Sequence, residues 1–251
     1  MKLIQVQDYQ EMSQKAAEIV IEKIKENPQI QLGLATGGTP EGFYNRLIAD
    51  HKENHTSYKQ VKSFNLDEYI GLSSTNPNSY HYYMADTFFN HIDINQEDTN
   101  LPNGTAENIQ EECSRYDEMI DKMGGIDLQI LGIGQNGHIG FNEPGTSFAS
   151  KTQVVDLAQS TIEANARYFD SIDEVPTQAV TMGIASIMKS KEIVLLVSGV
   201  AKAKALKQLI DGELTEEFPA SILKKHHNVT IIADQEALSE YASKSDSTLR
   251  G

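Results

Sequence analysis

Short apolar runs alternate with amphipathic segments along almost the whole chain, and this alternation constrains the fold more than any other feature of the sequence. Several of these runs are hydrophobic at consecutive positions, which is typical of strands that are buried on both faces. The expected strands are LIQV, QLGLAT, VKSFNL, IDLQILGIG, EIVLLVSG and VTIIAD. The alternation predicts an α/β fold of modified Rossmann-like type, in which helices cover both faces of a mostly parallel sheet.

The segments between these strands have helical periodicity. Asp8 is a plausible N-cap, and the residues that follow it place Ala16, Ile19, Val20 and Ile24 on one helical face. Further helices are expected at residues 40–54, 79–91, 108–123, 179–190 and 200–210. Residues 153–157 alternate in polarity more clearly, which predicts an edge or antiparallel strand.

The length of the chain suits one large domain or two small ones, and the absence of a linker favours a single domain over residues 1–251. No apolar run is long enough to cross a bilayer, and the N-terminus lacks the apolar core of a signal peptide. We therefore expect no membrane partner. The chain has a single cysteine, Cys113, which excludes an internal disulfide framework and favours a protein of the reducing cytoplasm. Cys113 lies in a helical pattern, and we expect it to be a structural residue.

The chain carries 36 acidic and 21 basic residues, for a formal net charge of −15. This charge would repel a polyphosphate backbone, so nucleic acid is not an expected partner. The acidity is typical of a solvated surface that keeps a protein in solution. An anionic small-molecule substrate would need a local cluster of Lys, Arg or backbone N–H groups.

In open sheets of this kind, ligands bind beyond the carboxyl ends of the strands. One such end is ATGGTP, which places Thr36, Gly37, Gly38 and Thr39 between a strand and a helix. Its N–H groups and the helix dipole could form a phosphate nest, although an ordinary glycine turn is the alternative. The turn lacks the ending of a P-loop, so it does not indicate binding of a nucleoside triphosphate.

Two cations could complete this nest. Arg167 lies in a helical pattern, and Lys202 opens the helix that follows the SGVA turn at another strand end. Taken singly, each is more often a solvated surface residue, because that is the common state of Lys and Arg, and only the strand-end position of Lys202 favours a site.

The stretch LGIGQNGHIGFNEPG contains Gly132, Gly134 and Gly137 in the G-x-G-x-x-G spacing of a dinucleotide-binding loop. That motif requires a helix directly after the glycines, but a proline and a glycine follow so closely that a helix would stop before its second turn. We therefore expect a long loop at a strand end rather than a nucleotide site.

This loop supplies Asn136, His138 and Glu143. A histidine bonded to a carboxylate can give or take a proton near neutral pH, whereas the alternative is a loop histidine with its hydrogen bonds satisfied. We expect no metal, because no second histidine has ligand spacing and His226 and His227 resemble an exposed basic turn.

At another strand end, NLDEY presents Asp67 and Glu68. Neighbouring residues of an extended chain point to opposite faces, so only one of the two carboxylates would look into a site. The alternative is that both are solvated loop residues.

Several stretches, in this order, resemble the glucosamine-6-phosphate deaminase family: TGGTP, FNLDEYIGL, NSYHYYM, GIGQNGHIGFNEPG, ANARYF, AVTMGIASIM and SGVAKAKAL. The resemblance covers nearly the whole chain, and NLDEY with GHIGFNEP is its most specific part. It implies conversion of glucosamine 6-phosphate to fructose 6-phosphate and ammonia without a cofactor, by a monomer or small homo-oligomer. Two alternatives remain, a 6-phosphogluconolactonase-like hydrolase and a non-catalytic sugar-phosphate sensor.

The resemblance also implies roles for the candidate residues. His138, oriented by Glu143 and Asn136, would open the sugar ring, and Asp67 would move the C2 proton to C1. Many relatives carry aspartate where this chain has Asn136. Relatives that N-acetylglucosamine 6-phosphate activates bind its phosphate through basic residues just after this loop. Gln153 and Val155 occupy those positions here, so we expect no activation.

Overall fold

A seven-stranded sheet forms the centre of the structure, a computed structural model that describes residues 1–242. All neighbouring strands in this sheet are parallel. Their order is β1 (Lys2–Val6), β10 (Val229–Asp234), β9 (Glu192–Val197), β6 (Leu128–Gly132), β2 (Gln31–Leu34), β3 (Lys62–Asn65) and β5 (Thr99–Asn100). The predicted mostly parallel sheet is therefore confirmed.

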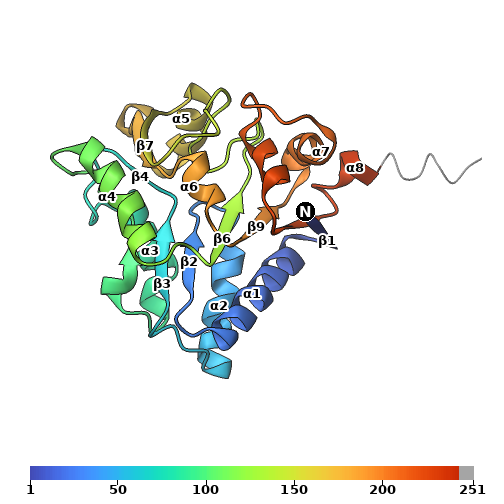
Figure 1. Cartoon of the computed structure of the whole chain (residues 1–251), viewed down its shortest axis with the longest axis horizontal. Helices are drawn as coiled ribbons and strands as arrows, with labels where there is room; N and C mark the ends of the chain where they lie inside the picture. Colours follow the sequence, from blue (N-terminus) through green and yellow to red (C-terminus); the bar gives the residue numbers. More distant parts are fainter. Residues whose placement is uncertain (243–251) are drawn as a thin grey trace, which may run out of the picture.

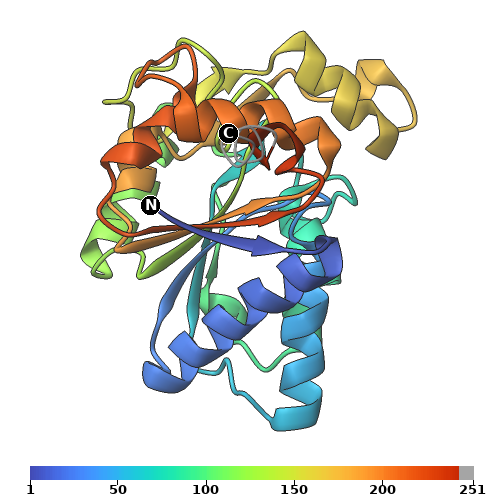
Figure 2. The same cartoon turned by 90° about the vertical axis from the view of Figure 1, so that its right-hand side faces the viewer.

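Helices cover both faces of this sheet, as Figures 1 and 2 show. One face packs against α1 (Tyr9–Glu26), α2 (Glu41–Asn54) and α3 (Tyr80–Thr87). The other face packs against α4 (Ile109–Lys122), α6 (Ile184–Met188) and α7 (Ala203–Asp211). Two short helices complete the set, α5 (Gln159–Asn165) and α8 (Ser239–Ala242). No described helix has the length and apolarity that a membrane span requires.

Short 3-10 helices occupy several connections. They are Phe89–His91, Gln96–Asp98, Ala166–Tyr168, Ile172–Glu174, Val200–Lys202 and Pro219–Lys225.

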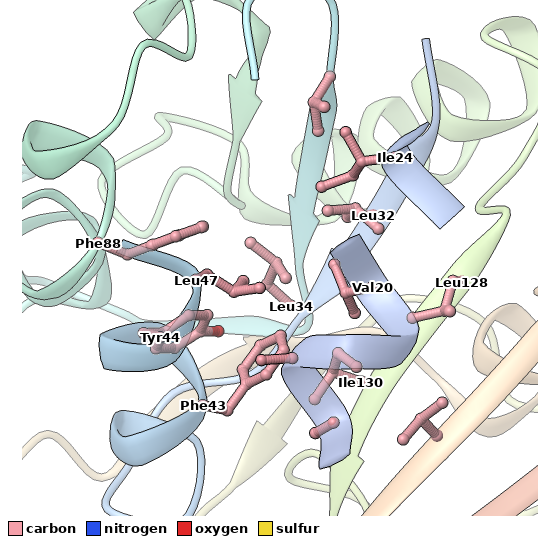
Figure 3. Packing of buried hydrophobic residues seen from close by; sticks show 14 of the residues in the cluster. Val20, Ile24, Leu32, Leu34, Phe43, Tyr44, Leu47, Phe88, Leu128 and Ile130 are labelled. Atoms are coloured by element: carbon pink, nitrogen blue, oxygen red, sulfur yellow. The ribbon is translucent and has the colours of Figure 1, made fainter. Parts of the chain in front are cut away.

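Alternate residues of the central strands enter two separate cores, because successive side chains of a strand point to opposite faces. In β9, Ile193 and Leu195 belong to one core, whereas Val194 and Leu196 belong to the other. Figure 3 shows the second of these cores, where β2 and β6 contribute Leu32, Leu34, Leu128 and Ile130 against side chains of α1 and α2. Burial on both faces explains why the strands read as continuous apolar runs.

Helix α1 begins where the sequence predicts. The Asp8 carboxylate accepts a hydrogen bond from the Glu11 backbone N–H at 2.9 Å, so Asp8 is the N-cap.

In α4, Cys113 is buried, and burial together with nearby Glu112 raises the pKa of its thiol to about 11. The thiol stays protonated near neutral pH, which agrees with its predicted structural role.

A second, three-stranded sheet lies beside the first and is antiparallel. Its order is β4 (Asp67–Tyr69), β8 (Gln178–Thr181) and β7 (Gln153–Asp156). The predicted edge strand is confirmed, since β7 pairs on one side only within this sheet. The prediction of one helix over residues 179–190 is wrong, because Ala179 to Thr181 pair with β4 and β7 and α6 begins only at Ile184.

The order of the parallel strands reverses direction between β2 and β6. From β2 the chain proceeds outward to β3 and β5, whereas β6 is followed outward by β9 and β10 on the other side. The loops that leave β2 and β6 therefore diverge, which opens a crevice at the carboxyl ends of these two strands.

Candidate active site

A cleft of about 550 Å³ lies at this crevice. Its walls come from the loops after β2 and β6, from β4, and from the segments that hold α5 and the start of α7. Most of the residues that the sequence predicts for a site line the cleft: Thr36, Gly37, Gly38, Thr39, Asp67, Asn136, His138, Arg167 and Lys202. Glu143 does not line the cleft itself but contacts three residues that do, Asn136, His138 and Thr161.

The glycine turn occupies one end of the cleft. Gly37 has a φ of +97°, a left-handed conformation that favours glycine. Pro40 then precedes α2, so the turn leads directly into the helix N-terminus. Lys202 lines the same cleft and is half-buried, and burial lowers the pKa of its ammonium group. The cleft thus combines a helix N-terminus with Lys202 and Arg167, a combination suited to an anion.

Asp67 lies deeper in the cleft and is only 6% exposed. Burial, with a smaller effect from the Glu68 charge, raises the pKa of Asp67 to about 8. The loop that carries His138 comes close to this carboxylate, because a Cβ built on Gly140 would lie 3.6 Å from Asp67 Oδ2. A carboxylate with a raised pKa next to a histidine loop suits proton transfer.

Glu68 points away from the cleft, as the sequence predicts for the neighbour of Asp67. Its carboxylate is fully buried and accepts hydrogen bonds from the backbone N–H groups of Tyr69 at 2.8 Å and of Tyr80 and His81 at 3.0 Å. The His81 Nδ1 atom lies 2.7 Å away. Glu68 therefore fixes the first turn of α3 against β4, and the alternative of two solvated carboxylates is wrong.

His138, Glu143 and Asn136 lie together in one group, in which the imidazole faces the carboxylate at a distance longer than a hydrogen bond. His138 Nδ1 lies 3.6 Å from Glu143 Oε2, and Asn136 Nδ2 donates to the same oxygen at 2.7 Å. Thr161 of α5 donates to the other oxygen at 2.8 Å. Burial alone would raise the pKa of Glu143, but His138, Asn136 and Thr161 lower it to about 2. Glu143 is therefore ionised near neutral pH, with its carboxylate beside the imidazole.

Asn136 acts on this group differently from the expectation that it orients the imidazole ring. Its amide nitrogen holds Glu143, and its amide oxygen accepts from the His138 backbone N–H at 3.2 Å. The Asn136 side chain therefore fixes the carboxylate and the loop backbone, and Glu143 alone faces the ring.

The glycines of the G-x-G-x-x-G spacing make room for packing. A Cβ on Gly134 would lie 2.2 Å from His138 Nδ1, and a Cβ on Gly137 would lie 2.2 Å from the Phe218 ring. Residues 133–152 contain no helix, so the predicted long loop is confirmed.

Sequence reasoning missed several residues of the cleft, among them Tyr80 and Thr161. The Tyr80 ring stacks on Phe141 with 6.1 Å between centroids and 10° between planes, and Tyr80 lines the cleft. Thr161 lines it as well and binds Glu143. For Tyr80 the signal was its place in NSYHYYM directly after the N-cap Ser79, whereas no local signal indicates Thr161.

The basic turn at residues 224–227 differs from its prediction. His226 is only 7% exposed, and its Nε2 atom lies 2.7 Å from the Ser190 carbonyl oxygen. The prediction of an exposed turn is therefore wrong for His226, which joins two connecting segments. Within residues 1–242, no three His, Cys, Asp or Glu side chains are grouped as a metal site would require.

Comparisons with known proteins agree with these features. Residues 7–232 match the family model described as glucosamine-6-phosphate isomerases/6-phosphogluconolactonase. The chain is 60% identical to a glucosamine-6-phosphate deaminase of Halalkalibacterium halodurans, over 98% of this chain and 100% of the relative. A monomeric glucosamine-6-phosphate deaminase of known structure is 54% identical with a TM-score of 0.94, over 96% and 100% of the two chains.

A more distant structure shares the fold alone. The 6-phosphogluconolactonase from Trypanosoma cruzi superposes with a TM-score of 0.76 over 95% of this chain and 96% of its own, at 18% identity.

Proposed function

The chain belongs to the glucosamine-6-phosphate isomerase/6-phosphogluconolactonase family, and from this premise we propose that it converts glucosamine 6-phosphate and water to fructose 6-phosphate and ammonia. One observation carries the proposal above all others. The buried Asp67 carboxylate shares a cleft with His138 and with the glycine turn and Lys202. These groups match the needs of the reaction, which are an anion site, a proton-transfer histidine and a base.

The first step opens the sugar ring. The ring oxygen must receive a proton and the anomeric hydroxyl must lose one, and His138 is placed to carry both. Glu143 faces His138 Nδ1 at 3.6 Å and stabilises the protonated imidazole, which leaves the other ring nitrogen for the substrate. The product is the open-chain amino aldehyde.

The second step moves a proton from C2 to C1. Asp67 in its ionised form removes the C2 proton while the aldehyde oxygen takes up a proton from solvent, which leaves an enolamine between C1 and C2. The protonated Asp67 then returns the proton to C1, so C2 becomes an iminium carbon. A raised pKa strengthens Asp67 as a base for a carbon-bound proton.

The last step releases ammonia. Water adds to the C2 iminium carbon, one of its protons passes to the nitrogen and the other to solvent, and ammonia leaves as the C2 ketone forms. The overall reaction transfers no electrons to or from the substrate, so the proposal includes no cofactor. The phosphate would remain at Thr36, Gly37, Gly38 and Thr39, with Arg167 and Lys202 as its cations.

The alternatives fit the cleft less well. A lactonase needs no base at C2, and a non-catalytic sensor needs neither Asp67 nor the His138–Glu143 pair. Both would leave unexplained why a carboxylate is buried next to the histidine loop, where ionisation is unfavourable.

We also propose that the chain acts as one domain and as a monomer in the cytoplasm. Both sheets contribute to the same cleft, since Asp67 belongs to β4 and the glycine turn follows β2. The structural relative with 54% identity is described as monomeric. Phosphorylated sugars are substrates of intracellular metabolism, which agrees with a cytoplasmic enzyme.

The test is an assay of ammonia release with glucosamine 6-phosphate as the only substrate. We expect ammonia and fructose 6-phosphate in equal amounts, and only slow turnover of glucosamine without phosphate. Hydrolysis of 6-phosphogluconolactone without ammonia release from the amino sugar would favour the lactonase instead. Binding of the sugar phosphate without turnover of either compound would favour the sensor.

A further inference from the structure

Two tyrosines hold the glycine turn from outside the cleft. Tyr9, the first residue of α1, donates its hydroxyl to the Gly38 carbonyl at 3.0 Å and accepts from the Gly42 backbone N–H at 2.7 Å. Tyr83 of α3 donates its hydroxyl to the Gly37 carbonyl at 2.8 Å. Neither tyrosine lines the cleft. The two carbonyls are thus directed toward residues outside the anion site.

The direction of these carbonyls determines the direction of two amides. In a planar trans peptide, the C=O and the following N–H point in opposite directions. The Gly37 carbonyl therefore sets the Gly38 N–H, and the Gly38 carbonyl sets the Thr39 N–H. Since Tyr83 and Tyr9 bind the two carbonyls, both N–H groups point away from these tyrosines, neither of which lines the cleft.

Peptide groups next to glycines need hydrogen bonds to fix their orientation more than other peptide groups do. Without a Cβ, Gly37 and Gly38 have free space around them, since a Cβ on either would meet no atom within 4 Å. A peptide flanked by glycines can rotate with little steric cost. A rotated peptide would present a carbonyl oxygen to the phosphate, and the two negative groups would repel each other.

We propose that Tyr9 and Tyr83 are positioning residues for phosphate binding, which hold the Gly37 and Gly38 carbonyls so that the Gly38 and Thr39 N–H groups face the ligand. This inference rests on the proposed function, because it assigns support for the same phosphate site. It adds two hydroxyls that do not touch the substrate. Hydrogen bonds of this kind preorganise the backbone donors before the anion arrives.

The packing between α1 and α2 agrees with this assignment. A Cβ on Gly42 would lie 2.4 Å from Ser13 Oγ and 2.9 Å from Tyr9 Cε1. Only glycine at position 42 lets the start of α2 approach the first turns of α1 closely enough for Tyr9 to reach both its N–H and the Gly38 carbonyl.

The variants that test the proposal are Tyr9→Phe, Tyr83→Phe and the double substitution. Each keeps the ring and removes only the hydroxyl. Tyr82→Phe is the matched control, since Tyr82 precedes Tyr83 in the same helix but is 42% exposed. Melting temperatures verify that all variants fold.

We expect each single variant to raise KM for glucosamine 6-phosphate about three- to tenfold, the effect of losing the neutral hydrogen bond to one carbonyl of the turn, with kcat within about twofold of the parent. The inhibition constant of inorganic phosphate should rise by the same factor. The kcat/KM for glucosamine, which lacks the phosphate, should stay unchanged. A general structural defect would lower turnover of both sugars alike.

Calorimetric titration with inorganic phosphate completes the design, because it requires no turnover. If the parent binds phosphate but releases no ammonia, the proposed function fails. The phosphate affinities of Tyr9→Phe and Tyr83→Phe would still test whether the two tyrosines support the phosphate site. Phosphate affinities of both variants equal to that of Tyr82→Phe would overturn the inference. So would a lower kcat with unchanged KM and phosphate affinity.

Discussion

Asp67 and Glu68 are neighbours in the chain but have opposite environments. Glu68 accepts three backbone N–H groups and lies beside His81, so its buried charge is compensated. Asp67 faces the cleft, where burial and the charge of Glu68 raise its pKa to about 8. The alternation of side chains along an extended strand thus separates a structural carboxylate from a reactive one.

The raised pKa of Asp67 predicts the pH dependence of the reaction. A general base must be ionised, and below about pH 8 the free enzyme holds a proton on Asp67. We therefore expect kcat/KM to rise about tenfold per pH unit on the acid side and to level off near pH 8. A pH–rate profile checks this, and an acid limb centred near pH 4 would contradict it.

Substitution of Asp67 by Asn should remove activity and stabilise the fold. An amide cannot accept the C2 proton, so we expect turnover to fall about a hundredfold or more while substrate still binds. Asp67 has an ordinary pKa of 3.8 when unfolded and about 8 when folded, so the folded state keeps a proton that the unfolded state loses. Stability contributed by this group is therefore lost as the pH rises from about 4 to 8.

The Asn variant carries no such proton. Its melting temperature should exceed that of the parent, and the difference should grow between pH 5 and pH 8. Near-normal release of ammonia by Asp67→Asn would refute the role of the base, and an equal melting temperature at pH 8 would refute the raised pKa.

Lys202 provides a test of the anion site. Its removal by Lys202→Ala should raise KM for glucosamine 6-phosphate roughly ten- to a hundredfold, because a charge-assisted bond contributes about 1.5 to 3 kcal/mol. Lys204→Ala is the control, since Lys204 is exposed on the same segment. If steady-state kinetics give both variants the parental KM, the phosphate lies elsewhere.

At the scale of elements, the loop after β6 determines where His138 lies. A methyl group at Gly134 would overlap the His138 ring, so Gly134→Ala should displace the imidazole and lower kcat roughly tenfold or more. At Gly132, the last residue of β6, a Cβ would meet no protein atom within 4 Å and would leave His138 in place, but Gly132 lines the cleft, so Gly132→Ala should raise KM rather than lower kcat. Equal kcat values for the two variants would contradict this account.

The elements of the central sheet could be predicted because their residues are buried on both faces. β9 is apolar at five of its six positions and β10 at four of six, so each is readily identified as a buried strand. Residues 179–190 show where this reasoning fails, because AVTMGIASIM is apolar enough for either a strand or a helix. Pairing with β4 and β7 selects the strand. Gly183 then brings the chain within contact of the Ser150 and Lys151 carbonyls before α6 begins.

At the scale of the whole molecule, the strand ends were enough to predict where the cleft lies, but not to predict all the residues that line it. The glycine turn, Asp67 and His138 follow strands, so the sheet brings them together. Tyr80 and Thr161 join them only because α3 docks on Glu68 and α5 docks on Glu143. These contacts join residues 12 and 18 positions apart, and the helical pattern that contains Tyr80 does not by itself place its ring in the cleft.

Regulation also belongs to this scale, and we expect that N-acetylglucosamine 6-phosphate does not activate the enzyme. Activation requires an effector that binds one of two states of the molecule more tightly. Gln153 lies on β7 with its amide nitrogen 3.3 Å from Asn142 Oδ1, and Val155 packs against the small core of the second sheet. Neither offers a cation to a second phosphate.

Lys151 is the charge from which an effector site could have been rebuilt nearby. It is exposed, and a single solvated lysine on a chain of net charge −15 is a weak anion site. Rate-versus-substrate curves with and without the acetylated sugar phosphate decide the matter. Because the proposed monomer would have no second catalytic site to couple, we expect hyperbolic curves that the effector leaves unchanged. A sigmoidal curve that becomes hyperbolic with effector would show a second site and a second state, and would also contradict the proposed monomer.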